Sequence, residues 1–166
     1  MKDPFRTAEA SKLLPAGSRI RVTQIGQALG EGFEKRANAE SEENPRYFWL
    51  EELPRWKAIR MMARCRLLIL TSVMEGGANA ISEALACSVP VLCSRISGSI
   101  GLLGENYPGY FTVGNTDELA ELLDRAERDS RFYNRLRRAC EERKRLIEPA
   151  RERDAWRALL EEVANA

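Results

Sequence analysis

The sequence contains no histidine among its 166 residues. Histidine is the commonest general base and metal ligand near neutral pH, so any chemistry has to come from carboxylates, backbone amides, lysine or arginine. Its absence argues against a zinc hydrolase. The four cysteines show no C-x-x-C spacing and lie among apolar or helical neighbours, so we expect them to be reduced and mostly to serve packing.

Long apolar runs and an excess of charge of one sign are also missing. No stretch approaches the roughly 20 apolar residues that a membrane span needs, and the first ten residues lack the apolar core of a signal peptide. The 26 basic and 25 acidic residues give a net charge of +1, which favours neither nucleic acid nor an anionic membrane as a partner. We therefore expect a soluble, cytoplasmic protein that forms a single domain over residues 1–166.

Residues 66–95 carry the most informative pattern of the chain. Leu67–Leu70 is a short apolar run of the kind found in buried parallel strands. Gly76 and Gly77 then break the pattern, and from residue 79 the apolar residues recur on one face of a helix. Val91–Cys93 follows a proline and predicts the next strand. The segment is therefore predicted to fold as strand, glycine turn, helix, strand.

Similar alternation along the rest of the chain predicts an α/β fold. We expect a Rossmann-like, doubly wound parallel sheet of about five to six strands, with helices on both faces and further helices at the C-terminus. About five strands are visible, and a sixth would precede Lys2. Trp56 falls at helical spacing with apolar neighbours and is predicted to lie in the core. A last apolar stripe comprises Trp156, Leu159, Leu160 and Val163.

The predicted glycine turn lies where a helix begins. Unpaired N–H groups and the positive end of the helix dipole favour an anion at such a place, and paired glycines let a ligand approach closely. Glu75 enters the turn and Glu83 lies eight positions later. Carboxylates accept hydroxyl hydrogen bonds, which suits sugar hydroxyls and a ribose diol. The pattern thus indicates a pocket for a nucleotide diphosphosugar, although a plain α/β turn with dipole-partner acids would give the same spacing.

The segment from Glu75 to Glu83, together with the Ala-rich helix and the small-Pro-Val strand after it, resembles the E-x7-E signature of the retaining GT-B glycosyltransferases of glycosyltransferase family 4. The resemblance extends over nearly the whole chain, as the C-terminal, donor-binding half of such an enzyme. It implies that Glu75 binds the donor sugar and that Glu83 binds the ribose. The amides that would face the sugar and diphosphate are those of Gly76, Gly77, Ala78 and Asn79.

The same resemblance implies that Lys2 binds the diphosphate and stabilises its departure, while a partner arginine would lie upstream of Met1. The N-terminal acceptor half of a GT-B enzyme is absent from the sequence. We therefore expect a fragment that binds a nucleotide-sugar, as donor substrate, with little or no activity by itself. The resemblance also implies metal-independent chemistry without a cofactor. Gly77 stands where many relatives carry a bulky residue, so the sugar cannot be inferred from the family.

A narrower resemblance is to the selenosugar synthases of selenoneine biosynthesis. The segments that carry it are Lys2-Asp-Pro-Phe-Arg6, Asn44-Pro-Arg-Tyr47, Met74-Glu-Gly-Gly-Ala-Asn79 and Gly101-Leu-Leu-Gly-Glu-Asn-Tyr-Pro-Gly-Tyr110. Such enzymes couple selenophosphate to a sugar taken from a UDP-sugar, so the resemblance implies selenophosphate as the acceptor.

Two other functional classes fit parts of the pattern. A non-catalytic nucleotide-binding or interaction module of the same fold would share every structural expectation and differ only in ligand chemistry. A Rossmann oxidoreductase fits less well, because no G-x-G-x-x-G follows any predicted strand.

Overall fold

The structure is a computed structural model, and it describes residues 2–28, 30 and 32–164. The strands are β1 (Val22–Gln24), β2 (Tyr47–Trp49), β3 (Leu68–Leu70), β4 (Val91–Ser94) and β5 (Tyr110–Phe111). The helices are α1 (Arg6–Lys12), α2 (Phe33–Glu43), α3 (Arg55–Met62), α4 (Asn79–Ala86), α5 (Ser97–Leu103), α6 (Thr116–Arg128), α7 (Ser130–Lys144) and α8 (Pro149–Ala164), with a 3₁₀ turn η1 (Arg145–Ile147) before the last. Strands and helices alternate as far as α6, which confirms the predicted α/β class.

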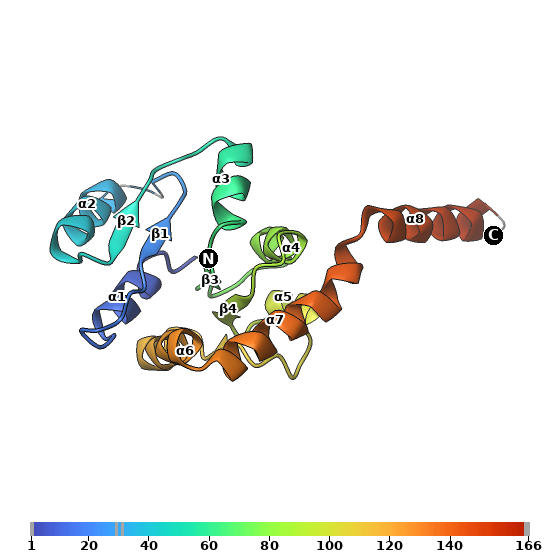
Figure 1. Cartoon of the computed structure of the whole chain (residues 1–166). Helices are drawn as coiled ribbons and strands as arrows, with labels where there is room; N and C mark the ends of the chain where they lie inside the picture. The colour runs from blue at the N-terminus through green and yellow to red at the C-terminus, as the bar shows by residue number, and fades with distance from the viewer. Residues whose placement is uncertain (1, 29, 31, 165–166) are drawn as a thin grey trace.

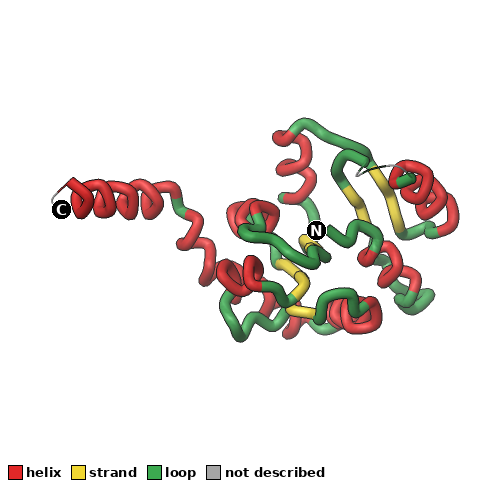
Figure 2. Tube along the Cα trace, turned by 180° about the vertical axis from the view of Figure 1, so that it is seen from behind, coloured by secondary structure: helices red, strands yellow, loops and turns green. Residues whose placement is uncertain are grey.

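The strands form two parallel sheets rather than the single sheet that was predicted. β1 pairs with β2, and the second sheet has the order β3-β4-β5. The Val22 amide donates to Arg46 O at 2.7 Å, just before β2, and the Leu68 amide donates to Pro90 O at 2.9 Å, just before β4. Figures 1 and 2 show the segment ahead of α1 between the two sheets.

The main core surrounds β3, β4 and β5. Helices α4, α6 and α7 lie around these strands in Figure 1, and each turns an apolar stripe inward. The largest fully buried side chains of this core include Ile81, Leu85, Val91, Leu92, Phe111, Leu119, Leu123, Phe132 and Leu136. Smaller clusters, one built on Phe5, Phe33 and Ala37 and another on Ala8, Val22 and Tyr47, hold β1 and β2 to α1 and α2.

Trp56 was predicted to lie in the core, and this prediction is wrong. Its side chain is 62% exposed, and α3 has no buried residue. The half-buried face of α3 contains Ala58, Ile59 and Met62. Ile59 comes only three residues after Trp56, so the exposed ring lies at the border of this face, in the first turn of the helix. The Lys57 ammonium covers the exposed ring instead, 5.5 Å from its centroid.

Helix α8 extends away from the rest of the chain (Figure 1). Its predicted apolar stripe is present, with Trp156, Leu160 and Val163 each more than half exposed. None of the helices described is long and apolar enough to cross a membrane.

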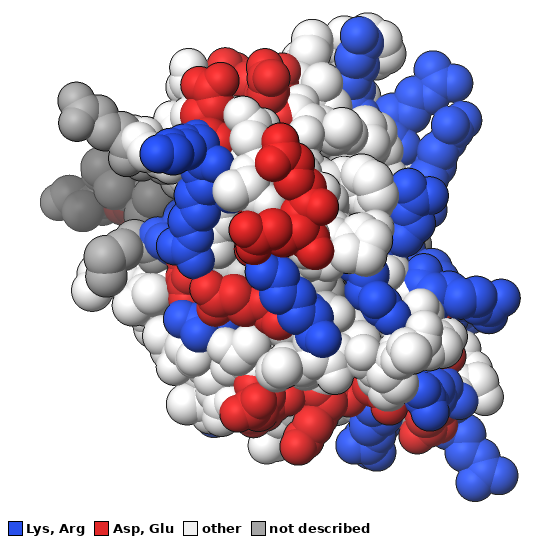
Figure 3. All heavy atoms as spheres, turned by 90° about the vertical axis from the view of Figure 1, so that its left-hand side faces the viewer, with Lys and Arg blue, Asp and Glu red and all other residues white. Residues whose placement is uncertain are grey.

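Both signs of charge occur on the face shown in Figure 3, where acidic side chains lie across the middle and Lys and Arg gather along one border. Two ion pairs join α1 to α2, namely Arg36 with Glu9 and Lys12 with Glu40, each at 2.8 Å.

Candidate functional site

The predicted glycine turn joins the carboxyl end of β3 to the start of α4. Helix α4 forms because Ile81, Ala84 and Leu85 fall on one face and are buried. Its N-cap residue, Ala78, has no side-chain oxygen to accept a hydrogen bond from the first turn. The first amides of α4 are therefore not capped by a side chain, as a ligand site at a helix start requires.

Several backbone amides of the turn have no acceptor among the residues that the structure describes. The Asn79 amide donates to Gly77 O at 3.2 Å, and the Ile81 amide donates to Ala78 O at 2.8 Å. Within the described residues, the amides of Gly76, Gly77, Ala78 and Ala80 are not hydrogen bonded. Such donors at a helix N-terminus can bind the oxygens of a phosphate group.

The two glycines leave the space above the turn open. A Cβ atom built on Gly76 or Gly77 would meet no described residue within 4 Å, and both glycines are exposed. Asn79 is also exposed, whereas Ala78 is only 1% exposed and contributes its side chain to the core. The structure thus places Gly76, Gly77 and Asn79 at the surface and Ala78 beneath them.

Glu75 is half-buried at the start of the turn. Its Oε1 accepts a hydrogen bond of 2.7 Å from Ser72 Oγ, and Ser72 is only 1% exposed. No hydrogen bond or ion pair to Glu75 Oε2 is present in the described part of the chain. One oxygen of this carboxylate is therefore fixed, and the other can accept a hydrogen bond from a ligand.

Glu83 lies on α4 and forms an ion pair with Arg55 of α3. Its Oε1 accepts from Arg55 Nη2 at 2.9 Å and from Nε at 3.2 Å. The Arg55 side chain is 83% exposed and that of Glu83 is 28% exposed, so this is a surface pair of small energy. Both bonds use the same oxygen, and Oε2 has no partner in the part of the molecule that is described.

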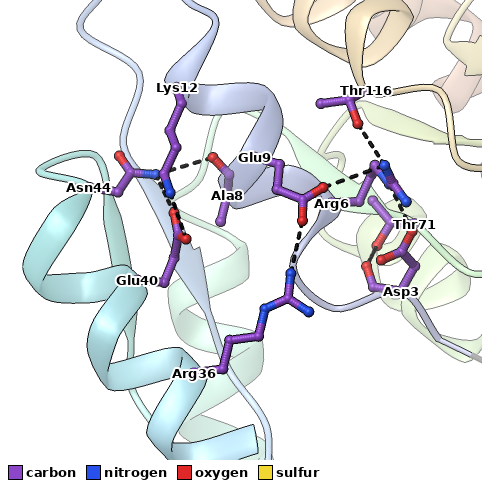
Figure 4. A network of polar contacts seen from close by, with 10 residues as sticks. All are labelled: Asp3, Arg6, Ala8, Glu9, Lys12, Arg36, Glu40, Asn44, Thr71 and Thr116. Carbon is purple, nitrogen blue, oxygen red and sulfur yellow. Dashed lines mark hydrogen bonds and ion pairs between the residues drawn. The ribbon is translucent and has the colours of Figure 1, made fainter.

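Lys2 is exposed and lies near the end of β3. The next residue, Asp3, accepts a 2.6 Å hydrogen bond through its carbonyl oxygen from Thr71 Oγ1, directly after β3. Arg6 fixes the same segment, because it bonds Asp3 at 2.8 Å and Thr116 at 2.6 Å (Figure 4). The backbone next to Lys2 is thus held at the end of β3, where the turn begins. No bond joins it to the other predicted site residues in the described structure.

The loop after β4 also reaches the turn, as expected for loops at the carboxyl edge of a parallel sheet. A Cβ atom built on Gly98 would lie 2.5 Å from the carbonyl oxygen of Glu75. Sequence reasoning did not single out Gly98, Ser72 or Arg55. Their roles depend on contacts across the fold, and the only sequence signal was the position of the loop after a strand.

The cysteines are not candidate nucleophiles. Burial raises the pKa of the Cys93 thiol to about 12 and also raises that of Cys140. A protonated thiol is a weak nucleophile, so these two serve packing, as predicted. All four cysteines are free, and Cys65 is exposed.

No group of three His, Cys, Asp or Glu side chains that could hold a metal ion occurs across the described ranges. Independence from a metal ion stays a prediction.

The comparisons with known proteins agree with this fold. A family described as "Glycosyl transferases group 1" matches residues 1–153. A comparison with curated proteins gives no match.

Several solved structures have the same fold. HepE (Alr3699) of Anabaena in complex with UDP and glucose superposes with a TM-score of 0.74 at 20% identity, over 99% of this chain and 45% of that chain. For HepE in complex with UDP-glucose the TM-score is 0.70 at 22% identity, over 88% of this chain and 44% of that chain. For HepE in complex with UDP the TM-score is 0.74 at 20% identity, over 99% of this chain and 46% of that chain. The chain spans less than half the length of these structures, and the likeness confirms the Rossmann-like fold.

Proposed function

The chain belongs to the Glycosyl transferases group 1 family, and on this basis we propose that its acid-glycine turn binds the nucleotide diphosphosugar donor of a glycosyl transfer. In this proposal Glu75 accepts hydrogen bonds from the donor sugar. Glu83 accepts them from the ribose, and the amides of Gly76 and Gly77 bind the diphosphate.

The observation that carries the proposal is the open, uncapped turn between two carboxylates. The space above Gly76 and Gly77 is empty, and their amides have no acceptor within the described residues. Glu75 and Glu83 each keep one carboxylate oxygen without a partner in the same ranges. Anion-binding donors between two hydroxyl-binding acceptors match the chemistry of a diphosphate between a sugar and a ribose.

We propose a UDP-sugar as the donor. The superposed HepE structures contain UDP, UDP with glucose, or UDP-glucose, and this likeness of fold supports uridine over other nucleosides. Glu75 lies at the turn and Glu83 lies on the exposed side of α4, so a donor would extend from Glu75 along the start of the helix.

Lys2 would supply the positive charge of the reaction. Breaking the bond between the sugar and the diphosphate places negative charge on the leaving group, so fixed amides and a cation stabilise the transition state more than the ground state. Lys2 is exposed and lies next to the segment that Thr71 holds at the end of β3. From there its flexible side chain can turn toward a diphosphate at the turn.

The acceptor would be bound by a further half of the protein, outside the 166 residues. The exposed apolar stripe of α8 supports such a half. We further propose selenophosphate as the acceptor, on the sequence resemblance alone. This is tested in a protein that includes the acceptor half, by measuring whether selenophosphate accelerates the release of UDP from a UDP-sugar.

Titration calorimetry with UDP and UDP-glucose tests the donor site. The chain should bind both, and Glu75→Ala should remove the preference for UDP-glucose over UDP. Glu121→Ala, which removes an exposed glutamate of α6, should leave both affinities unchanged. Flat heats for both ligands would instead favour the non-catalytic interaction module and contradict the proposed donor site.

A further inference from the structure

Two residues outside the predicted ligand contacts hold Glu75 in place. Ser72 Oγ donates a 2.7 Å hydrogen bond to one oxygen of the carboxylate, and Ser72 is only 1% exposed. Such a bond limits the rotamers of Glu75 and leaves its other oxygen for a ligand.

Gly98 fixes the backbone of the same residue. A Cβ atom at this position would lie 2.5 Å from Glu75 O, 3.3 Å from Glu75 C and 3.6 Å from Gly76 C. Real Cβ atoms essentially never approach another atom within 3.0 Å. The first turn of α5 can therefore pack on the acid-glycine turn only because residue 98 has no side chain.

We propose that Ser72 and Gly98 are positioning residues that set the direction of the Glu75 carboxylate toward the donor sugar. This inference rests on the proposed function. Ser72 follows β3 and Gly98 follows β4, so both act from the ends of paired strands. Support from rigid elements can hold a binding group within the narrow range of geometry that recognition needs.

Helix α5 offers a matched pair of substitutions for Gly98. Gly98→Ala and Gly101→Ala each add one methyl group to the same helix, but a Cβ at Gly101 would meet nothing within 4 Å. Both replacements favour helix formation, and only the one at residue 98 adds a contact with the turn.

Ser72→Ala has its own control in Ser94→Ala. Both serines are 1% exposed. Ser72 follows β3 and Ser94 ends β4, but only Ser72 donates a hydrogen bond to Glu75. A general effect of losing a buried hydroxyl would therefore appear in both variants.

Two measurements are made on all four variants: the amide resonances of Gly76 and Gly77 in the free protein, and the affinities for UDP-glucose and UDP. Gly98→Ala should move both resonances, whereas Gly101→Ala should leave them unchanged. Gly98→Ala and Ser72→Ala should weaken UDP-glucose binding about tenfold or more and change UDP binding less than about threefold. Their controls should retain the wild-type preference.

The inference is overturned if Gly98→Ala leaves the Gly76 and Gly77 resonances in place, or if Gly98→Ala and Ser72→Ala keep the wild-type preference for UDP-glucose. If wild-type protein itself binds UDP-glucose no better than UDP, the sugar-binding part of the proposed function fails, and the inferred role of both residues fails with it. The resonances then still show whether Gly98 positions the turn, which separates the two failures.

Discussion

The ion pair between Glu83 and Arg55 allows a sharp test of whether Glu83 is a ligand residue or only a partner of an arginine. Both Arg55 bonds end on Oε1 of Glu83, so Oε2 remains for a ribose hydroxyl. We compare Glu83→Ala with Arg55→Ala. Alanine is the best helix former, and neither side chain is buried, so both variants should fold.

The expected loss of UDP affinity is at least about twofold larger for Glu83→Ala than for Arg55→Ala. A hydrogen bond to a charged group contributes about 1.5–3 kcal/mol, so Glu83→Ala should weaken UDP binding about 10- to 150-fold. An exposed ion pair contributes about 0.2–1 kcal/mol, so Arg55→Ala should change UDP affinity less than about fivefold. The free energy of unfolding should fall by no more than about 1 kcal/mol in either variant.

Titration calorimetry with UDP measures the affinities, and urea unfolding measures stability. The reasoning is refuted if Glu83→Ala binds UDP as tightly as Arg55→Ala does. In that case the carboxylate only pairs with Arg55, and the ribose is bound elsewhere.

Three other predictions follow from the described contacts. Asn44→Ala should lower the free energy of unfolding, measured in urea, by about 2 kcal/mol or more. The reason is that Asn44 is 2% exposed and its side-chain amide donates hydrogen bonds to Ala8 O and Ser11 Oγ. A loss below about 0.5 kcal/mol would contradict this. Lys2→Ala should weaken UDP binding with unchanged stability, as measured by calorimetry and urea unfolding, and equal affinity would exclude Lys2 from the site. Thiol titration at pH 8 should modify the exposed Cys65 in the folded protein, but Cys93 and Cys140 only after unfolding, because these two are 0% and 2% exposed; rapid modification of all three would argue against the buried core.

The unit from β3 to β4 could be predicted because its signals are local. The apolar run Leu67–Leu70, the glycine turn and the periodic helix each depend on residues a few positions apart, and β3, α4 and β4 confirm them. The resemblance rests on this same segment, and the family match over residues 1–153 confirms its coarser part.

The rest depends on contacts between residues far apart in the sequence. Arg55 and Glu83 are 28 positions apart, and Gly98 meets Glu75 from the first turn of α5, after another strand. Nothing in the local pattern of either pair indicates the contact. The division of the sheet could not be predicted for a similar reason, since periodicity identifies strands but not their neighbours. The exposed Trp56 shows that helical spacing alone does not indicate how deeply each residue along one face of a short helix is buried.

Labelling the protein with ¹⁵N and titrating it with UDP-glucose tests the central claim most directly. The amide resonances of Gly76, Gly77 and Ala80 should shift together with increasing ligand and saturate at a common dissociation constant, while those of α8 stay in place. If the ligand binds and these three resonances do not move, the acid-glycine turn is not the donor site.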